Sequence, residues 1–256
     1  MTIKLGRVSE LVCYPVKSMA GTSVESAFLD WHGLLGDRRF AFRRLNTNSG
    51  SPWLTASRLP QLILYRPCGF KQSLGEPQPT HVLTPSGEYL ELLSEKLNRE
   101  VSDRFGRRVE MMHLRNGIFD DSTVSVINSA TVAHVCREGG VGIDKRRFRA
   151  NIVLDGGEGG AFAEDSWVGS TLVFGEEESG PAVYVTKRNG RCIIINLDPE
   201  TGEQTPRVMN AVVQLNDNNA GIYGTVVRTG RIQIHDPVTL VQSARLPQTA
   251  HSLPFG

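Results

Sequence analysis

The sequence has no long apolar run and no excess of either sign of charge. Its 256 residues include 28 Lys and Arg and 27 Asp and Glu, so the formal net charge is +1. Such a balance gives no general attraction to nucleic acid or to an anionic membrane, and any anion binding must come from local clusters. No apolar stretch approaches the roughly 20 residues of a membrane span. We therefore expect neither nucleic acid nor a membrane as a partner.

Cysteines are few, and their spacing matches no common metal or redox motif. Cys13, Cys68, Cys136 and Cys192 form no C-x-x-C pair and no zinc-finger spacing with histidine. A chain of this length needs no disulfides to stabilise its core, and scattered thiols suit a reducing compartment. The first residues show no basic region followed by an apolar core, as a secretory signal would. We expect a cytoplasmic protein.

Common catalytic motifs are also missing. No histidines form H-x-x-x-H or H-E-x-x-H, and no serine lies in G-x-S-x-G, which disfavours a zincin or an α/β-hydrolase. The glycine-rich segment 155–160 has no G-K-[ST] and carries two acids. It is therefore interpreted as a surface loop rather than a phosphate-binding loop.

Short apolar segments between many glycines and prolines predict a mainly β protein with a few helices, closer to a barrel than to a doubly wound sheet. Segment 69–79 is expected to be an exposed loop, and 246–256 a poorly ordered tail. Helices are predicted over 94–105, 128–138 and 206–215. Strands are predicted over 8–16, 23–29, 39–45, 61–66, 80–84, 88–92, 150–154, 171–174, 183–186, 192–197, 222–228, 232–235 and 238–241.

Three basic motifs are candidate anion sites. Lys17 and Ser18 combine a cation and a hydroxyl where a strand meets a loop, although both could be solvated residues of an ordinary strand end. Arg38 is suited to bidentate contact with phosphate, and the alternative is an ion pair with Asp37. The run 145–149 holds four cations before an apolar strand headed by Asn151, and it is either an anion site or a solvated face.

Cys192 lies between a basic loop and an apolar run. Lys187, Arg188 and Arg191 lie within five residues of it. Nearby cations favour the thiolate, which is the form that attacks electrophiles or binds soft metals. The alternative is a small apolar residue at the start of a buried strand. The local sequence leaves both interpretations open.

In this order along the chain, the motifs resemble those of the MOSC proteins, named for the C-terminal domain of molybdenum cofactor sulfurase. The resemblance is closest to the amidoxime-reducing components and their bacterial relatives, and it covers about residues 3–242. Each motif alone is weak, whereas six in order are specific. The motifs are YPVKS at 14–18, GDRRF at 36–40, FRANI at 148–152, AEDSW at 163–167, RC at 191–192 with DPETG at 198–202, and DPV at 236–238.

The resemblance implies an N-terminal MOSC-type β-barrel domain at 1–115, a MOSC β-barrel domain at 116–245 and a tail at 246–256. It also implies a molybdopterin-type molybdenum cofactor bound between elements of both domains. The cysteine that ligates molybdenum in the family corresponds to Cys192, which is thereby the implied metal ligand and catalytic residue. The implied cofactor-binding residues are Lys17, Ser18, Arg38, Arg149, Asn151, Arg191 and Cys192.

The implied function is a molybdenum-dependent oxidoreductase, independent of pyridoxal phosphate, that reduces small N-hydroxylated compounds. No cysteine follows Cys192, so the segment after it cannot hold an iron–sulfur cluster by four thiolates. Electrons are therefore expected from a separate ferredoxin, flavodoxin or cytochrome-type protein. The alternatives are a cofactor or sulfur carrier with a persulfide on Cys192, and a binding barrel with a degenerate site. Two positions depart from the family pattern: Gly190 replaces a serine of some relatives, and Ala150 a frequent proline.

Overall fold

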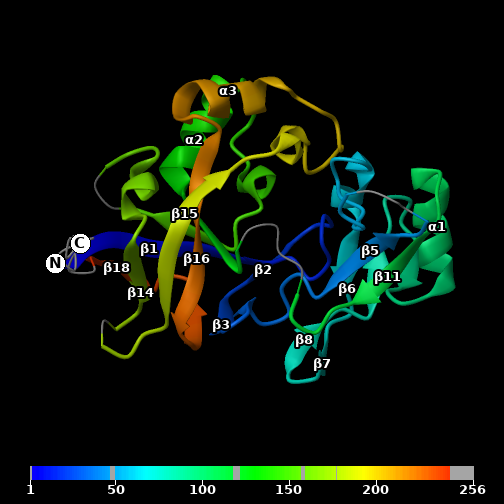
Figure 1. Cartoon of the computed structure of the whole chain (residues 1–256), viewed down its shortest axis with the longest axis horizontal. Coiled ribbons are helices and arrows are strands. Elements are labelled where there is room, and N and C mark those ends of the chain that lie inside the picture. Colours follow the sequence, from blue (N-terminus) through cyan, green and yellow to red (C-terminus); the bar gives the residue numbers. More distant parts are fainter. Residues whose placement is uncertain (1, 47–49, 118–121, 157–158, 177, 243–256) are drawn as a thin grey trace, which may run out of the picture.

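The computed structural model describes residues 2–46, 50–117, 122–156, 159–176 and 178–242. Within these ranges the chain forms a β-barrel and, beside it along the long axis of the molecule, a second part built of small sheets and one helix (Figure 1). The tail at 246–256 lies outside the described residues. No helix of the described part combines the length and the apolar character needed to cross a bilayer.

A closed ring of seven strands forms the barrel. Neighbouring strands follow the order β13-β12-β16-β15-β14-β18-β1, and β1 pairs with β13 to close the ring, which leaves no free edge. Adjacent strands are antiparallel except β12 and β13, and β2 is added at the side of β1. The strands are β1 (Thr2–Cys13), β2 (Thr22–Val24), β12 (Val124–Asn128), β13 (Ile152–Asp155), β14 (Ser170–Phe174), β15 (Ala182–Gly190), β16 (Asn219–Arg228) and β18 (Pro237–Gln242).

Apolar side chains fill the barrel interior. Leu11, Val124, Ile152, Leu172 and Ile222 are fully buried and belong to one continuous cluster. A small barrel of this kind is a packed core rather than a channel. Chemistry must therefore be found at the rim of the barrel or between it and its neighbours.

Two helices cover one side of the barrel (Figure 1), namely α2 (Ser129–Glu138) and α3 (Arg207–Asn216). The side chain of Asn128 caps α2 by accepting from the backbone N of Ala130 at 2.9 Å. A second apolar cluster lies between these helices and the barrel, with Val132, Val135, Val208 and others fully buried. Both helices, and α1 (Glu95–Phe105) in the other part, confirm the predicted helices to within one or two residues.

The second part has its own apolar core, in which Phe42, Leu62, Tyr65 and Leu97 are fully buried. Ser94 caps α1 through the backbone N of Leu97 at 3.3 Å, and the helix ends at Gly106 in the left-handed region. The other strands of this part are β5 (Phe40–Arg44), β6 (Arg66–Cys68), β7 (Lys71–Ser73), β8 (Glu76–Gln78), β9 (His81–Leu83), β10 (Tyr89–Glu91) and β11 (Val109–His113). Strands β3 (Ser26–Asp30), β4 (Gly33–Leu34) and β17 (Gly230–Gln233) form a small sheet whose buried apolar residues belong to the barrel cluster.

The prediction of a mainly β fold with few helices is confirmed: most of the described elements are strands, with three α-helices. The predicted division of the chain at residues 115 and 116 stays a prediction. The topology is relevant to this division, because β1 comes from the first residues of the chain and yet is a strand of the barrel.

Three local predictions are wrong. Residues 192–197 form a 3-10 helix at Ile193–Asn196 rather than a strand, because Ile195 turns into the core while Ile193 stays 49% exposed. Residues 61–66 form a 3-10 helix at Pro60–Leu64 followed by β6, with Pro60 in the first helical turn. The predicted exposed loop at 69–79 is a hairpin of β7 and β8, whose second strand is buried at Glu76 because that carboxylate pairs with Arg39 at 2.8 Å.

Candidate anion and thiol site

Six of the seven predicted site residues line a single pocket, which we call the Cys192 pocket. They come from the loop after β1, the turn before β5, the segment before β13 and the loop after β15, so only the fold brings them together. Ser125, Arg147, Phe148, Asn189 and Tyr223 also contribute to the lining. The six are Lys17, Ser18, Arg38, Arg149, Arg191 and Cys192. Their roles toward a ligand stay predictions.

Positive charge dominates this lining. Among the described residues that line the pocket there are five cations and no Asp or Glu. The cations are Lys17, Arg38, Arg147, Arg149 and Arg191. Guanidinium and ammonium groups bind phosphate through charge-assisted hydrogen bonds, so the pocket is suited to a strongly anionic ligand.

Arg38 is held from behind by a buried carboxylate. Asp37 is fully buried, accepts from the backbone N of Tyr14 at 2.7 Å and forms an ion pair with Arg38. Burial opposes the charge of Arg38, and the Asp37 carboxylate more than offsets it, so the pKa of Arg38 is raised. The ion pair with Asp37, considered above as an alternative to ligand binding, is present, and Arg38 lines the pocket as well.

The ring of Tyr14 makes cation–π contacts with two of the guanidinium groups. The Cζ atom of Arg149 lies 4.3 Å from the ring centroid and that of Arg38 lies 5.2 Å from it. Burial raises the pKa of Tyr14 to about 12, so the phenol stays neutral. A neutral aromatic face lets two cations approach each other without adding a negative charge to the site.

Left-handed backbone conformations occur at three of the site residues. Ser18, Arg38 and Arg149 have φ values of 67°, 50° and 51°. Residues other than glycine seldom adopt this region, and each such position costs free energy that the surrounding structure must offset. The coincidence of three in one pocket indicates that the orientation of these side chains is imposed by the fold.

Arg191 differs from the other cations because its polar partners are neutral. Its Nε donates to the carbonyl of Ala220 at 2.7 Å and its Nη1 to the carbonyl of Phe148 at 2.6 Å. No described carboxylate pairs with it. Loss of water around the guanidinium lowers its pKa. An anion bound in the pocket would therefore find in Arg191 a charge that the described protein does not already neutralise.

Cys192 is exposed, whereas Cys13 and Cys136 are buried and Cys68 is half-buried. Burial raises the pKa of Cys13 well above its usual value and also raises that of Cys136. The interpretation of Cys192 as a small buried residue is thus wrong. Within the described ranges, no cluster of three or more His, Cys, Asp or Glu side chains could hold a metal ion. Cys192 is the soft donor that the pocket itself offers.

Asn151, the seventh predicted residue, lies behind the pocket rather than in its lining. It is buried, and its Oδ1 accepts from Arg38 Nη1 at 3.3 Å and from Ser125 Oγ at 3.0 Å. Its Nδ2 donates to the carbonyl of Val12 at 3.3 Å. The amide thus holds Arg38 in place. Sequence reasoning missed Ser125, because a serine within the apolar segment 124–128 gives no signal of a polar site.

The dense basic run divides into separate roles. Three of its four cations have an acidic partner within 2.8 Å, and Arg149 faces the Cys192 pocket. The pairs are Lys145 with Glu10, Arg146 with Asp144 and Arg147 with Asp198. The run is therefore a solvated face at one end and part of the pocket at the other. Of the cations near Cys192 in sequence, Arg188 pairs with Asp165 at 2.9 Å, and Arg191 lines the pocket.

Comparison with known proteins agrees with this architecture. Residues 5–102 match the MOSC N-terminal beta barrel domain and residues 111–239 match the MOSC domain. The chain matches no curated protein. The YuaD protein from Bacillus subtilis has a similar fold, with a TM-score of 0.52 and 17% identity over 95% of this chain and 98% of that one. YiiM from Escherichia coli is more distant, with a TM-score of 0.43 and 12% identity over 93% and 71%. The two domain matches span most of the chain, which belongs to the MOSC family.

Proposed function

We propose that the chain binds a molybdenum cofactor of the molybdopterin type and uses it to reduce small N-hydroxylated compounds. MOSC domains are associated with the molybdenum cofactor. The observation that carries the proposal is the combination, in one pocket, of an exposed thiol with five cations and no described carboxylate.

The donor set fits such a cofactor at both ends. The exposed Cys192 side chain would offer molybdenum a soft sulfur ligand, and the pterin phosphate is an anion that Lys17, Arg38 and Arg149 are suited to bind. The Cys192 pocket has a volume of about 90 Å³ and shares Arg147, Arg149 and Ile194 with a neighbouring cavity of about 420 Å³. A ligand larger than the pocket would extend toward that cavity.

In the proposed reaction the bound cofactor supplies two-electron chemistry: the N–O bond breaks, and two electrons and two protons yield the amine and water. The protein's own residues bind and orient. Cys192 would hold the metal, Lys17 and Ser18 would bind the phosphate region with Arg38 and Arg149, and Arg191 would balance anionic charge beside the thiolate. Asn151 and Asp37 would keep Arg38 in position. A separate electron-transfer protein would deliver the electrons.

The test uses protein from a host that makes the cofactor. We expect about one molybdenum per chain, a fluorescent pterin after oxidation, and reduction of benzamidoxime with a chemical electron donor. Cys68→Ala is the matched control for Cys192→Ala, because both remove one thiol and only Cys192 lies in the pocket. Turnover by protein that holds neither metal nor pterin would refute the proposal.

A second candidate function is supported by the exposure of Cys192, since an accessible thiol could take the outer sulfur of a donor protein's persulfide, releasing the donor's thiol, and carry that sulfur as its own persulfide. Intact-mass spectrometry of the purified protein would then show an added sulfur that is lost on reduction and absent in Cys192→Ala. A persulfide without bound pterin would favour a sulfur carrier over the oxidoreductase.

A further inference from the structure

A second cavity, which we call the outer cavity, adjoins the Cys192 pocket. It has a volume of about 420 Å³ and shares Arg147, Arg149 and Ile194 with the pocket. Its walls include apolar side chains such as Ile63 and Leu197, which belong to one buried cluster. A cavity of this volume with apolar walls and a few charged groups is typical of small-molecule sites.

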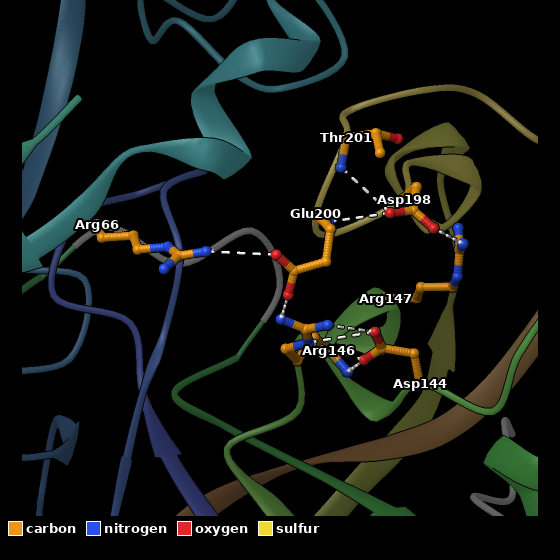
Figure 2. Close-up of polar contacts among 7 residues, drawn as sticks. All are labelled: Arg66, Asp144, Arg146, Arg147, Asp198, Glu200 and Thr201. Carbon is orange, nitrogen blue, oxygen red and sulfur yellow. Dashed lines mark hydrogen bonds and ion pairs between the residues drawn. The ribbon is translucent and has the colours of Figure 1, made fainter. Parts of the chain in front are cut away.

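The charged groups of this lining are mostly arginines. The lining holds four guanidinium groups and two carboxylates. The arginines are Arg66, Arg146, Arg147 and Arg149, and the acids are Glu10 and Glu200. Two further acids hold the arginines without lining the cavity: Asp144 accepts from Arg146 Nη2 and Asp198 from Arg147 Nη2, each at 2.7 Å (Figure 2).

Glu200 lies between two of these arginines, as Figure 2 shows. Its Oε2 accepts from Arg66 Nη2 at 3.3 Å, and its Oε1 accepts from Arg146 Nη1. Arg146 uses its Nε and Nη2 on Asp144, so its Nη1 is the group directed at Glu200. The backbone N of Glu200 donates to Asp198 Oδ1 at 2.9 Å, which fixes the point from which its side chain starts.

These contacts are open to water and therefore weak. The side chains of Arg66, Arg146 and Glu200 are 62%, 52% and 54% exposed. Ion pairs at this exposure contribute roughly 0–1 kcal/mol each. Another carboxylate or phosphate could therefore replace Glu200 between the two guanidinium groups at little cost. The position is preformed for an anion, and the protein fills it with one of its own.

We infer that the outer cavity binds a small organic acid whose carboxylate or phosphate lies between Arg66 and Arg146, and that Glu200 is a built-in competitor for this position. The body of the ligand packs against the apolar walls near Ile63 and Leu197. Binding of the acid depends on the cavity and its arginines rather than on a metal, so it occurs in protein without the proposed cofactor.

The experiment titrates the full-length protein with benzoate and phenyl phosphate as anionic probes, and with benzamide as a neutral molecule of the same shape. Calorimetry or NMR shift changes measure the affinity. We expect Glu200→Gln to bind the anions about tenfold more tightly, because the competitor loses its charge, and to bind benzamide unchanged. The double variant Arg66→Gln with Glu200→Gln should lose this gain.

Glu88→Gln is the matched control, because it removes one negative charge from another exposed pair, that with Lys96, outside the cavity lining. If Glu88→Gln and Glu200→Gln gained the same affinity for the anions, the gain would follow from net charge alone, and the inference would be overturned. So would unchanged benzoate affinity in Glu200→Gln with only a loss of stability, which would make Glu200 a simple link between the two parts. Benzoate binding abolished by Arg191→Met and retained in Arg66→Gln would assign the acid to the Cys192 pocket and overturn the inference as well. Repeating the titration on metal-free protein separates this result from the proposed function.

Discussion

The two neighbouring cavities hold their positive charges in different ways. In the Cys192 pocket, Arg38 rests on the fully buried Asp37, and Arg191 contacts only neutral groups of the described chain. In the outer cavity, Arg66 and Arg146 are half exposed and share Glu200. Because water screens and solvates exposed charges, removing one partner of an ion pair costs little free energy at the surface and much more inside the protein. Substitutions in the Cys192 pocket should therefore have large effects on stability or ligand binding, and substitutions at the mouth of the outer cavity should have small ones.

The largest expected effect is that of Cys192→Ala on function. If the pocket binds the cofactor through this thiol, the variant should lose molybdenum and turnover almost completely. Its melting temperature as metal-free protein should match that of the wild type, because the side chain is exposed. Metal analysis, benzamidoxime reduction and thermal unfolding measure the three quantities. Full molybdenum content in this variant would remove Cys192 from the site.

Asp37→Asn tests the buried pairing directly. The substitution leaves the Arg38 guanidinium without its counter-charge inside the protein, so we expect a loss of roughly 3–5 kcal/mol of unfolding free energy. Urea unfolding followed by circular dichroism measures it. Asp217→Asn is the control, since this exposed residue follows α3. A loss below about 1 kcal/mol would mean that the buried pair behaves like an exposed one, and the comparison would fail.

Arg191→Met tests whether Arg191, a cation of the pocket with no acidic partner among the described residues, binds anions. The change leaves the carbonyls of Ala220 and Phe148 without this donor, at a cost of roughly 1–3 kcal/mol in stability. Inorganic phosphate, used as the probe, should bind about tenfold more weakly. Arg188→Met is the matched control, because Arg188 lies outside the lining and pairs with Asp165. Equal phosphate affinity in both variants would contradict a role of Arg191 in anion binding.

Glu164 extends the comparison to a buried acid whose hydrogen-bond donors are neutral. Its Oε2 accepts from Thr131 Oγ1 at 2.9 Å and its Oε1 from the backbone N of Asn128 at 3.2 Å. Burial raises its pKa in the folded protein. The neutral Glu164 carboxyl therefore contributes its full stabilisation at pH values below its pKa in the unfolded chain. This contribution is lost as the pH rises through its pKa in the folded protein. Compared with Glu164→Gln, the wild type should lose relative stability as the pH rises above the ordinary glutamate pKa of about 4. A stability difference that does not change with pH in urea unfolding would refute this.

Arg66→Gln should have the smallest effect. The exposed pair with Glu200 contributes about 0–1 kcal/mol to stability, and salt screens it. The difference from the wild type should therefore shrink further between 0.05 and 0.5 M salt, by about half or more. Urea midpoints at the two salt concentrations measure it. A salt-independent loss of several kcal/mol would show that the pair joins the two parts of the molecule as strongly as a buried one.

Much of the fold could be predicted from local sequence. Two of the three helices follow from capping residues and terminating glycines, as at Asn128 and Gly106, and the hairpin of β9 and β10 follows from its proline–glycine turn. Two of the failures concern burial that local sequence does not show. The apolar run after Cys192 suits a buried strand and a buried 3-10 helix equally, because periodicity does not separate short buried segments. Similarly, only the contact with Arg39 shows why Glu76 is buried in an otherwise polar hairpin.

For the site, motif order identified six residues that the fold brings into one pocket, and Asn151 behind them. Local reading could not decide which cation of the basic run faces a ligand, since Arg146, Arg147 and Arg149 are adjacent and differ only in the partners that other segments supply. Nor could it find Ser125, or the pairing of Arg66 with Glu200 across 134 positions of sequence.

The sequence by itself determined the chemistry available to this protein: one thiol among cations, a β-rich chain and the ordered MOSC motifs. Tertiary structure alone decided that Cys192 is exposed, that Asp37 stands behind Arg38 and that an acid of the chain lies between two arginines of the outer cavity. The physical reason is that charge and burial act through space. Whether a cation is neutralised depends on distances set by strands and loops remote in sequence, and the free energy of each pair depends on how much water the fold leaves around it.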